Sequence, residues 1–358
     1  MARPVNGSGG IALLIILAIF SACAKGTQPA GENPGPRQKL ENEIRKELDN
    51  YETDADFTLM VESANGKRFS HSTGSSGESV LYRSASTSKL VTAVVILTLV
   101  EDSLLSLEDH PGDYIPSWPD TGNLAAITLR HLLSFTSGLA DKPFCLNLPS
   151  ADFEECVARI AGVNANARPP GEEFYYSPGH LQVAGLMAVK ASGLASWQEL
   201  FTRFKSKTGL FPNGNYDLPS LQNPRLAGGM HWNAAEYLAF LRALYEQRIL
   251  GAGLIAQMTE DQLRGAAIGY SPSLAAIGED WHYGFGLWIE CHDNPFNCNR
   301  TTRVSSPGAY GAYPFIDYEN RYYGILAREG AYGTFDKGYR LFESIAPKLE
   351  EWALMSDD

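Results

Sequence analysis

Segments with strand-like patterns lie near both ends of this chain and are missing from its middle, and this distribution strongly constrains the fold. Near the start, 57–62 and 67–71 flank Asn65-Gly66, a dipeptide typical of a tight β-hairpin turn. Three short, aromatic-rich segments near the end are bounded by Gly, Pro, Asp or Asn: 283–291, 312–317 and 322–327. We therefore expect one antiparallel sheet to which both ends of the chain contribute.

Helices are expected beside this sheet at both ends of the chain. An apolar stripe over 40–51 predicts a first helix, and a last amphipathic helix is predicted over about 337–355. A third strand near 79–83 leads into a further helix, which runs from 86 to about 101.

The middle of the chain has a different pattern. From about 109 to 225, helical segments are joined by long loops rich in Pro and Gly. The sequence thus predicts one domain over 38–352 with an α/β (α+β) sandwich fold. Its antiparallel sheet and flanking terminal helices come from about 38–108 and 226–352, and a mostly helical insertion comes from about 109–225.

Composition excludes one class of partner. The chain has 358 residues and a formal net charge of −12. Because such a surface repels phosphates, we expect no nucleic-acid partner. The sequence also has no phosphate-cradling loop and no cofactor fingerprint, so no cofactor and no metal is expected.

The N-terminus predicts export. Ile11–Phe20 is an apolar run of ten residues. At about 1.5 Å per residue it is too short to cross a hydrocarbon core of roughly 30 Å, so it predicts a signal peptide over 1–22. Ser21-Ala22-Cys23 resembles a bacterial lipobox, which would make Cys23 the lipidated first residue of the mature protein. The alternative is ordinary secretion with cleavage near Ala22–Ala24.

The segment after the signal peptide is predicted to connect a lipid anchor to the folded domain. Residues 23–37 are rich in Gly and Pro and form a predicted flexible tether. We expect an exported protein of the periplasm or cell envelope, held at a membrane through a lipid on Cys23.

The other cysteines fall into two close pairs. Cys145 and Cys156 form one pair, and Cys291 and Cys298 form the other. In an oxidising compartment this spacing predicts two local disulfides. Since His282 and His292 lie near the second pair, a metal site there is the alternative, although the spacing is not that of a known zinc motif.

Ser86-Thr87-Ser88-Lys89 can place a nucleophile and a base on one helix. Residues three apart share a helix face, so Lys89 can reach the Ser86 hydroxyl. A lysine held against an apolar helix is desolvated, which lowers its pKa and lets it act as a neutral base. Taken alone, however, the four residues favour a serine at a helix start followed by a solvated lysine.

The sequence around this motif supports the catalytic interpretation. Three stretches matter most: 82–93 around Ser86, 127–139 (Ile-Thr-Leu-Arg-His-Leu-Leu-Ser-Phe-Thr-Ser-Gly-Leu) and 224–229. Together they resemble the serine β-lactamase and penicillin-binding protein family, nearest its esterase and class C-like branch. The resemblance covers about 38–352. It implies that family's fold, with Ser86 as nucleophile and Lys89 as proton acceptor.

The family's second motif is Tyr-x-Asn. The stretch 170–178 resembles the approach to it and makes Tyr176 the catalytic tyrosine, with Pro178 where Asn is usual. A tyrosine beside Lys89 can pass the Ser86 proton to a leaving group. A shifted register would use Tyr175 with Ser177 instead.

The third motif is Lys-Thr-Gly or His-x-Gly on the edge strand. The corresponding stretch is 306–311, where Ser306 takes the place of the cation and Arg303 is the nearest positive charge. The resemblance implies that the N–H groups of Ala309 and Ser86 form an oxyanion hole. It also implies that Ser306 and Gly308 border the substrate.

These features predict a hydrolase acting on a small ester or a peptide-like amide. An acyl-enzyme would form at Ser86, with Lys89 and Tyr176 as proton-transfer groups. Because Pro178 and Ser306 replace substrate-binding residues of the family, an esterase or peptidase is favoured. The alternatives are a β-lactamase or D,D-peptidase, and a non-catalytic envelope lipoprotein that keeps the fold.

Overall fold

The computed structural model describes residues 34–298 and 303–356 of the chain. Residues 36–358 form one compact unit, separate from residues 1–35. The predicted signal peptide over 1–22, the lipidation site Cys23 and most of the predicted tether lie outside the described residues. Within the described ranges, no helix combines the length and the apolar character that crossing a membrane requires.

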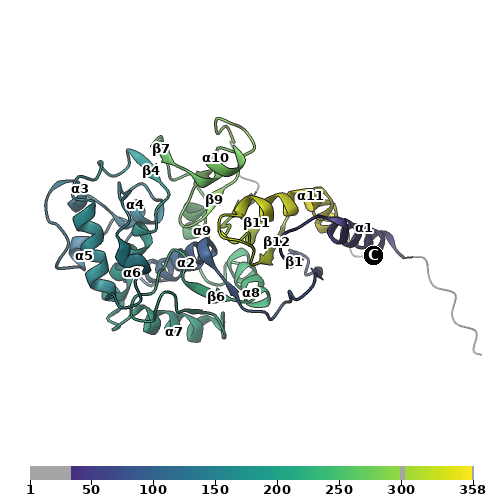
Figure 1. Cartoon of the computed structure of the whole chain (residues 1–358), viewed down its shortest axis with the longest axis horizontal. Helices are drawn as coiled ribbons and strands as arrows, with labels where there is room; N and C mark the ends of the chain where they lie inside the picture. Colours follow the sequence, from purple (N-terminus) through teal and green to yellow (C-terminus); the bar gives the residue numbers. More distant parts are fainter. Residues whose placement is uncertain (1–33, 299–302, 357–358) are drawn as a thin grey trace, which may run out of the picture. The chain divides into compact units, whose positions relative to one another are not determined.

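A seven-stranded antiparallel sheet is built from both ends of the chain, as the sequence predicts (Figure 1). Its strand order is β2-β1-β12-β11-β10-β9-β8. The strands are β1 (Phe57–Ser63), β2 (Arg68–Ser72), β8 (His282–Tyr283), β9 (Trp288–Ile289), β10 (Arg303–Ser305), β11 (Tyr313–Asp317) and β12 (Tyr322–Arg328). Pairing of β1 with β12, which sets Val61 opposite Gly324, joins the two ends.

Helices cover both faces of this sheet. On one face α11 (Phe335–Leu354) contacts β11 and β12 and also packs against α1 (Pro36–Asn50). On the other face lies α8 (Ala234–Tyr245). Successive strand residues point to opposite faces. Accordingly, Phe315 contacts Phe342 of α11, and Tyr323, which pairs with Ile316, contacts Tyr245 of α8.

The predicted third strand does not join the seven-stranded sheet. It is shortened to β3 (Tyr82–Arg83), which pairs with β6 (Met230–Trp232), and β6 in turn pairs with β5 (Asn215–Tyr216). Ser84 continues this pairing, since its N–H donates to the Met230 carbonyl at 2.9 Å. Strand β3 therefore pairs with β6, the strand that follows the predicted helical insertion in sequence.

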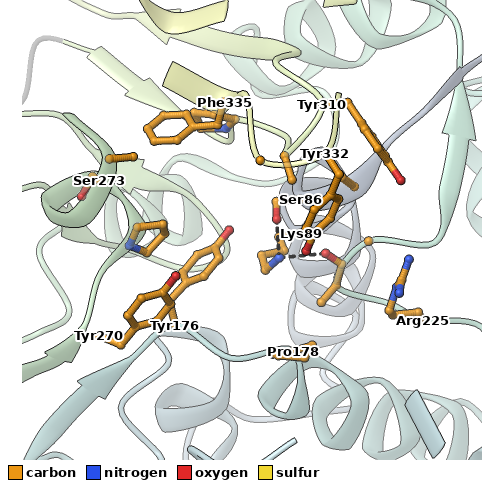
Figure 2. Close-up of a pocket in the computed structure, with 18 of the residues that line it drawn as sticks. Ser86, Lys89, Tyr176, Pro178, Arg225, Tyr270, Ser273, Tyr310, Tyr332 and Phe335 are labelled. Carbon is orange, nitrogen blue, oxygen red and sulfur yellow. Dashed lines mark hydrogen bonds between the residues drawn. The ribbon is translucent and has the colours of Figure 1, made fainter. Parts of the chain in front are cut away.

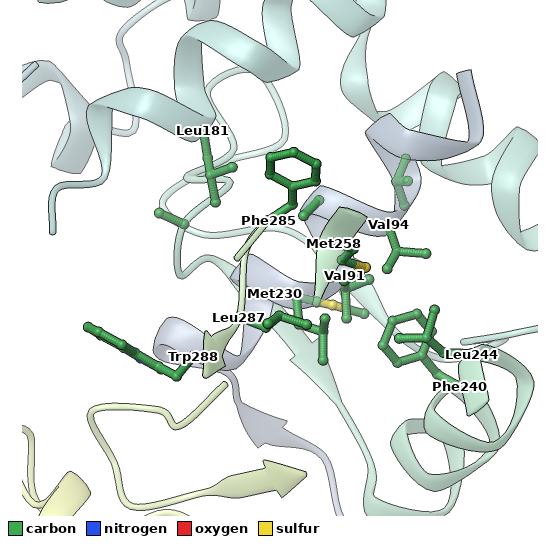
Figure 3. Close-up of a cluster of buried hydrophobic side chains, with 14 of the residues drawn as sticks. Val91, Val94, Leu181, Met230, Phe240, Leu244, Met258, Phe285, Leu287 and Trp288 are labelled. Atoms are coloured by element: carbon green, nitrogen blue, oxygen red, sulfur yellow. The ribbon is translucent and has the colours of Figure 1, made fainter. Parts of the chain in front are cut away.

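Helix α2 (Ser88–Glu101) is the central helix, and a 3₁₀ turn, Ala85–Thr87, precedes it. Eleven of its fourteen residues are buried, which is why its sequence is apolar on every side. Figure 3 shows Val91 and Val94 of α2 in a cluster with Met230, Met258 and Leu287. The helix that follows the predicted nucleophile is thus fixed by core packing along its length.

Short elements fill the region between the two parts of the sheet. The helices are α3 (Gly122–Ala125), α4 (Leu129–Leu133), α5 (Phe153–Val163), α6 (Gly179–Ser192), α7 (Trp197–Thr208), α9 (Ala252–Met258) and α10 (Pro272–Ile277). A parallel pair of strands, β4 (Glu173–Tyr175) and β7 (Ala267–Tyr270), was not expected from the sequence. It brings a segment from within the predicted insertion beside one that follows it by about ninety residues.

Candidate active site

Ser86 and Lys89 lie together at the start of α2 (Figure 2). Lys89 Nζ is 2.8 Å from Ser86 Oγ and 2.8 Å from the carbonyl oxygen of Ala227. Lys89 is buried, whereas Ser86 is half-buried and lines a cavity. The predicted nucleophile is therefore accessible, and the group beside it is shielded from water.

The backbone at Ser86 is tightly held. Ala85, the residue before it, has a positive φ of 45°, which a non-glycine residue adopts only when its surroundings enforce it. The surroundings include Thr87, whose hydroxyl accepts from Trp232 Nε1 at 2.8 Å and whose carbonyl accepts from the Tyr237 hydroxyl at 2.8 Å. This turn orients Ser86 toward the cavity and leaves its N–H in the first helical turn, where such groups have no intrahelical partner.

Burial lowers the pKa of Lys89 well below its ordinary value, and the positive charges of Arg225 and Lys142 lower it further. Its hydrogen-bond partners within the described ranges are the Ser86 hydroxyl and the Ala227 carbonyl, and neither is a carboxylate. A lysine in this setting loses its proton far more readily than a solvated one. The amine can therefore accept the Ser86 proton.

Tyr176 lies beside this pair, directly after β4 (Figure 2). Lys89 Nζ is 4.7 Å from the centre of its ring, which also stacks on Trp288 with 5.1 Å between ring centres. Tyr176 and Pro178 both line the cavity, but Tyr175 does not and instead contacts Tyr270. This is the register favoured on sequence grounds.

Burial raises the pKa of the Tyr176 hydroxyl, and its interaction with Ser86 offsets only part of that rise. The phenol consequently stays protonated at neutral pH. It is therefore suited to donating a proton and not to accepting one.

The loop after β10 contains Ala309, whose N–H is the second predicted oxyanion donor beside that of Ser86. The Gly308 carbonyl accepts from the Gly311 N–H at 2.8 Å, which fixes the plane of the peptide between Gly308 and Ala309. In a trans peptide the Ala309 N–H points away from that carbonyl. Gly308 is required here, because a Cβ would lie 2.7 Å from the Ser84 carbonyl oxygen. Ala309 lines the cavity with Ser86, so both predicted oxyanion donors belong to one site.

Three residues considered from the sequence are not among those that line the cavity: Gly308, Ser306 and Arg303. Ser306 is buried and its hydroxyl donates to the backbone carbonyl of Ser86 at 3.3 Å. Arg303 is buried in β10, where it pairs with Glu290 at 2.7 Å and with Glu343. Ser306 thus braces the nucleophile turn, and Arg303 has no access to a substrate in the cavity.

The cavity has a volume of about 510 Å³ and several walls that sequence reasoning missed. Its aromatic lining comes from segments far apart in sequence and, besides Tyr176, includes Tyr270, Trp288, Tyr310, Tyr332 and Phe335. Its cationic lining residues besides Lys89 are Lys142 and Arg225. One signal for Arg225 was present, because it lies inside the stretch 224–229 that resembles the re-entry into the sheet.

Both cysteine pairs form disulfides, Cys145–Cys156 and Cys291–Cys298. The two histidines near the second pair have carboxylate partners instead. His282 Nδ1 is 2.7 Å from Asp261, and His292 Nδ1 is 3.3 Å from Glu279. The structure thus has the disulfide arrangement and not the metal arrangement at Cys291 and Cys298.

Comparison with known proteins gives one family and many similar folds. The family model described as Beta-lactamase matches residues 61–341. No curated protein sequence matches the chain. Among solved structures, a candidate beta-lactamase from Bacteroides dorei DSM 17855 is 25% identical with a TM-score of 0.72, over 86% of this chain and 97% of the other.

Two further solved structures share the fold at lower identity. EstCE1, a hydrolase with promiscuous acyltransferase activity, is 17% identical with a TM-score of 0.67, over 89% of this chain and 98% of the other. A penicillin-binding protein from Bacillus halodurans is 18% identical with a TM-score of 0.64, over 86% of this chain and 98% of the other.

Proposed function

The chain belongs to the beta-lactamase family, and from that premise we propose that it is an exported serine hydrolase that cleaves an ester or amide through an acyl-enzyme at Ser86. The observation that carries the proposal is the 2.8 Å approach of the buried Lys89 amine to the half-buried Ser86 hydroxyl. Two disulfides support an extracytoplasmic setting, because they persist in oxidising compartments. A lipid on Cys23 would hold the protein at a membrane.

In the proposed acylation step, neutral Lys89 takes the Ser86 proton while Ser86 Oγ attacks the substrate carbonyl. The N–H groups of Ser86 and Ala309 hold the resulting oxyanion, and such paired donors typically contribute several kcal/mol. Tyr176 then donates its proton to the leaving group and recovers one from the Lys89 ammonium. Water releases the acyl group by the same proton transfers in reverse.

An ester or peptide-like substrate is the favoured class. The family's usual cation and asparagine are replaced by Ser306 and Pro178, and Ser306 is buried away from the cavity. The fold shared with EstCE1 is consistent with this class, since that protein is a hydrolase with promiscuous acyltransferase activity. The second candidate is β-lactamase or D,D-peptidase activity, supported by the family match and by the fold shared with the Bacillus halodurans penicillin-binding protein.

An active-site label tests this proposal. A fluorophosphonate probe is expected to label the wild-type protein and to block hydrolysis of 4-nitrophenyl butyrate. Ser86→Ala is expected to abolish both labelling and turnover. Ser273→Ala is the matched control, because this serine also lines the cavity but its hydroxyl is paired with Ser271 at 2.8 Å.

The possible results separate the three functions. Labelling that persists in Ser86→Ala would refute Ser86 as nucleophile. No labelling of the wild type would favour a non-catalytic lipoprotein. A specificity constant for a chromogenic cephalosporin above that for the butyrate ester would favour the β-lactamase alternative.

A further inference from the structure

Within the described ranges, Arg225 is the arginine that lines the cavity, and its side chain forms no ion pair with a carboxylate. Arg242, Arg303 and Arg328 each form an ion pair with a carboxylate. The side-chain partner recorded for Arg225 is neutral: its Nη1 donates to Asn147 Oδ1 at 2.6 Å. Arg225 is half-buried as a whole residue and lines the cavity that holds Ser86. No acidic side chain of the described residues therefore neutralises this guanidinium at the cavity wall.

The cavity as a whole carries positive charge. Within the described ranges, its lining includes the cations Lys142 and Arg225 and no Asp or Glu, while burial favours the neutral form of Lys89. Lys142 is exposed, and its ammonium lies 5.6 Å from the centre of the Tyr270 ring. A cleft lined by one sign of charge concentrates ligands of the opposite sign. This acidic protein thus has a site suited to an anion.

The backbone holds Arg225 in a fixed position. Its N–H donates to the Leu218 carbonyl at 2.8 Å, and its own carbonyl accepts from the N–H groups of Gly228 and Gly229. Gly229 permits this turn, because a Cβ there would lie 2.1 Å from the Leu218 carbonyl oxygen. A guanidinium on such a fixed turn is well placed to bind a carboxylate through two parallel hydrogen bonds.

The position of Arg225 indicates which part of the substrate it meets. Figure 2 shows Tyr176 and Arg225 on opposite sides of Ser86 and Lys89. In the proposed mechanism Tyr176 donates to the leaving group, so the leaving group lies on the Tyr176 side. The acyl part then extends toward Arg225.

We propose that Arg225 binds a carboxylate carried by the acyl part of the substrate, with Lys142 adding to the attraction, so that the enzyme prefers acyl groups with a terminal negative charge. This inference rests on the proposed function and names the substrate class of the same site. Arg225, in the turn before β6, would thus take the role that the family usually gives to a cation on the edge strand.

Two esters that differ only in charge test the inference. They are the 4-nitrophenyl monoester of adipic acid and its neutral carboxamide counterpart. We expect the wild-type kcat/KM to be at least about tenfold higher for the carboxylate ester, because one charge-assisted hydrogen bond gives a preference of that order. Arg225→Gln is expected to remove most of this preference, and Arg225→Lys to keep part of it.

Arg340→Gln is the control for the loss of one positive charge. Arg340 is exposed on α11 and does not line the cavity, so the preference should not change in this variant. A wild-type ratio near one, or a preference that survives in Arg225→Gln, would overturn the inference and leave the proposed hydrolase function intact.

Direct binding separates failure of this inference from failure of the proposed function. The Ser86→Ala protein should bind the carboxylate ester without cleaving it, as measured by isothermal titration calorimetry. Binding should be at least about tenfold weaker in Ser86→Ala/Arg225→Gln. This titration remains informative if the wild type hydrolyses neither ester. Weaker binding of the carboxylate ester by Ser86→Ala/Arg225→Gln than by Ser86→Ala would support the anion site, and equal binding would refute it.

Discussion

At the scale of single residues, the most constrained group is the amine of Lys89. It is buried, and its two close polar partners are the Ser86 hydroxyl and the Ala227 carbonyl. Neither partner carries a negative charge, so burial and the nearby Arg225 and Lys142 disfavour the ammonium form. Arg225 therefore has two effects in this site, one on the substrate and one on the base.

The pH dependence of ester hydrolysis tests the state of Lys89. Because the neutral amine is the active form and its pKa lies well below the ordinary 10.5, kcat/KM for the butyrate ester should rise with pH and level off well below 10.5. Arg225→Gln removes a positive charge and should move this midpoint to higher pH, whereas Arg340→Gln should not. A midpoint that stays in place in Arg225→Gln would contradict the electrostatic account.

At the scale of secondary structure, α6 depends on the buried His180 in its first turn. Its Nδ1 lies 2.8 Å from the Ser137 hydroxyl and its Nε2 lies 2.9 Å from the Tyr175 carbonyl oxygen. The ring also stacks on Phe135 with 4.7 Å between centres. His180 thus ties α6 to the segment that presents Tyr176 and to the loop after α4.

Acid should weaken this arrangement. Burial lowers the pKa of His180 from 6.5 to about 4. Between these values the unfolded chain binds a proton that the folded state excludes, so stability is full above pH 6.5 and is lost as the pH falls toward 4. The free energy of unfolding of the wild type should fall between pH 7.5 and pH 5. In His180→Gln this fall should be smaller by roughly 2 kcal/mol, as measured by urea denaturation.

His292→Gln is the control for this measurement. The hydrogen bond to Glu279 raises the pKa of His292, so this histidine stabilises the folded state at low pH. Its removal should therefore change the pH slope in the opposite direction, and by less, because the side chain is exposed. An identical pH slope in wild type and His180→Gln would show that His180 is not the acid-sensitive group.

At the scale of the whole molecule, stability depends on contacts between the two ends of the chain. Strand β1 pairs with β12, and α1 packs against α11. Trp352 near the end of α11 is fully buried, contacts the ring of Phe69 in β2 and donates from Nε1 to Glu41 of α1 at 3.0 Å. One side chain therefore joins three elements that are far apart in sequence.

Removing this side chain should destabilise the whole fold. Trp352→Ala leaves a large cavity and is expected to lower the free energy of unfolding by about 3–5 kcal/mol. Leu354→Ala, two residues further along the same helix, should change it by less than about 0.5 kcal/mol because Leu354 is 60% exposed. Urea denaturation measures both, and equal losses would contradict the packing argument.

The sequence by itself determined the features that depend on residues close together in the chain. The hairpin at Asn65-Gly66, the three-residue spacing from Ser86 to Lys89 and the two short cysteine loops all fall in this class. So do most helices, because backbone hydrogen bonding and the apolar repeat operate over three or four residues. The family resemblance placed these local features in the correct overall fold.

The tertiary structure alone decided which side chains share the cavity. Lys142 and Arg225 line it, whereas Arg303, the nearest cation to the third motif in sequence, is held by Glu290 and Glu343. Tertiary contacts also determined that β3 pairs with β6 in a small separate sheet and does not join the seven-stranded sheet. These outcomes depend on contacts between distant segments, for which the chain has no fixed period or spacing. Whether a charge meets a partner or a cavity is set by the packing of several elements at once.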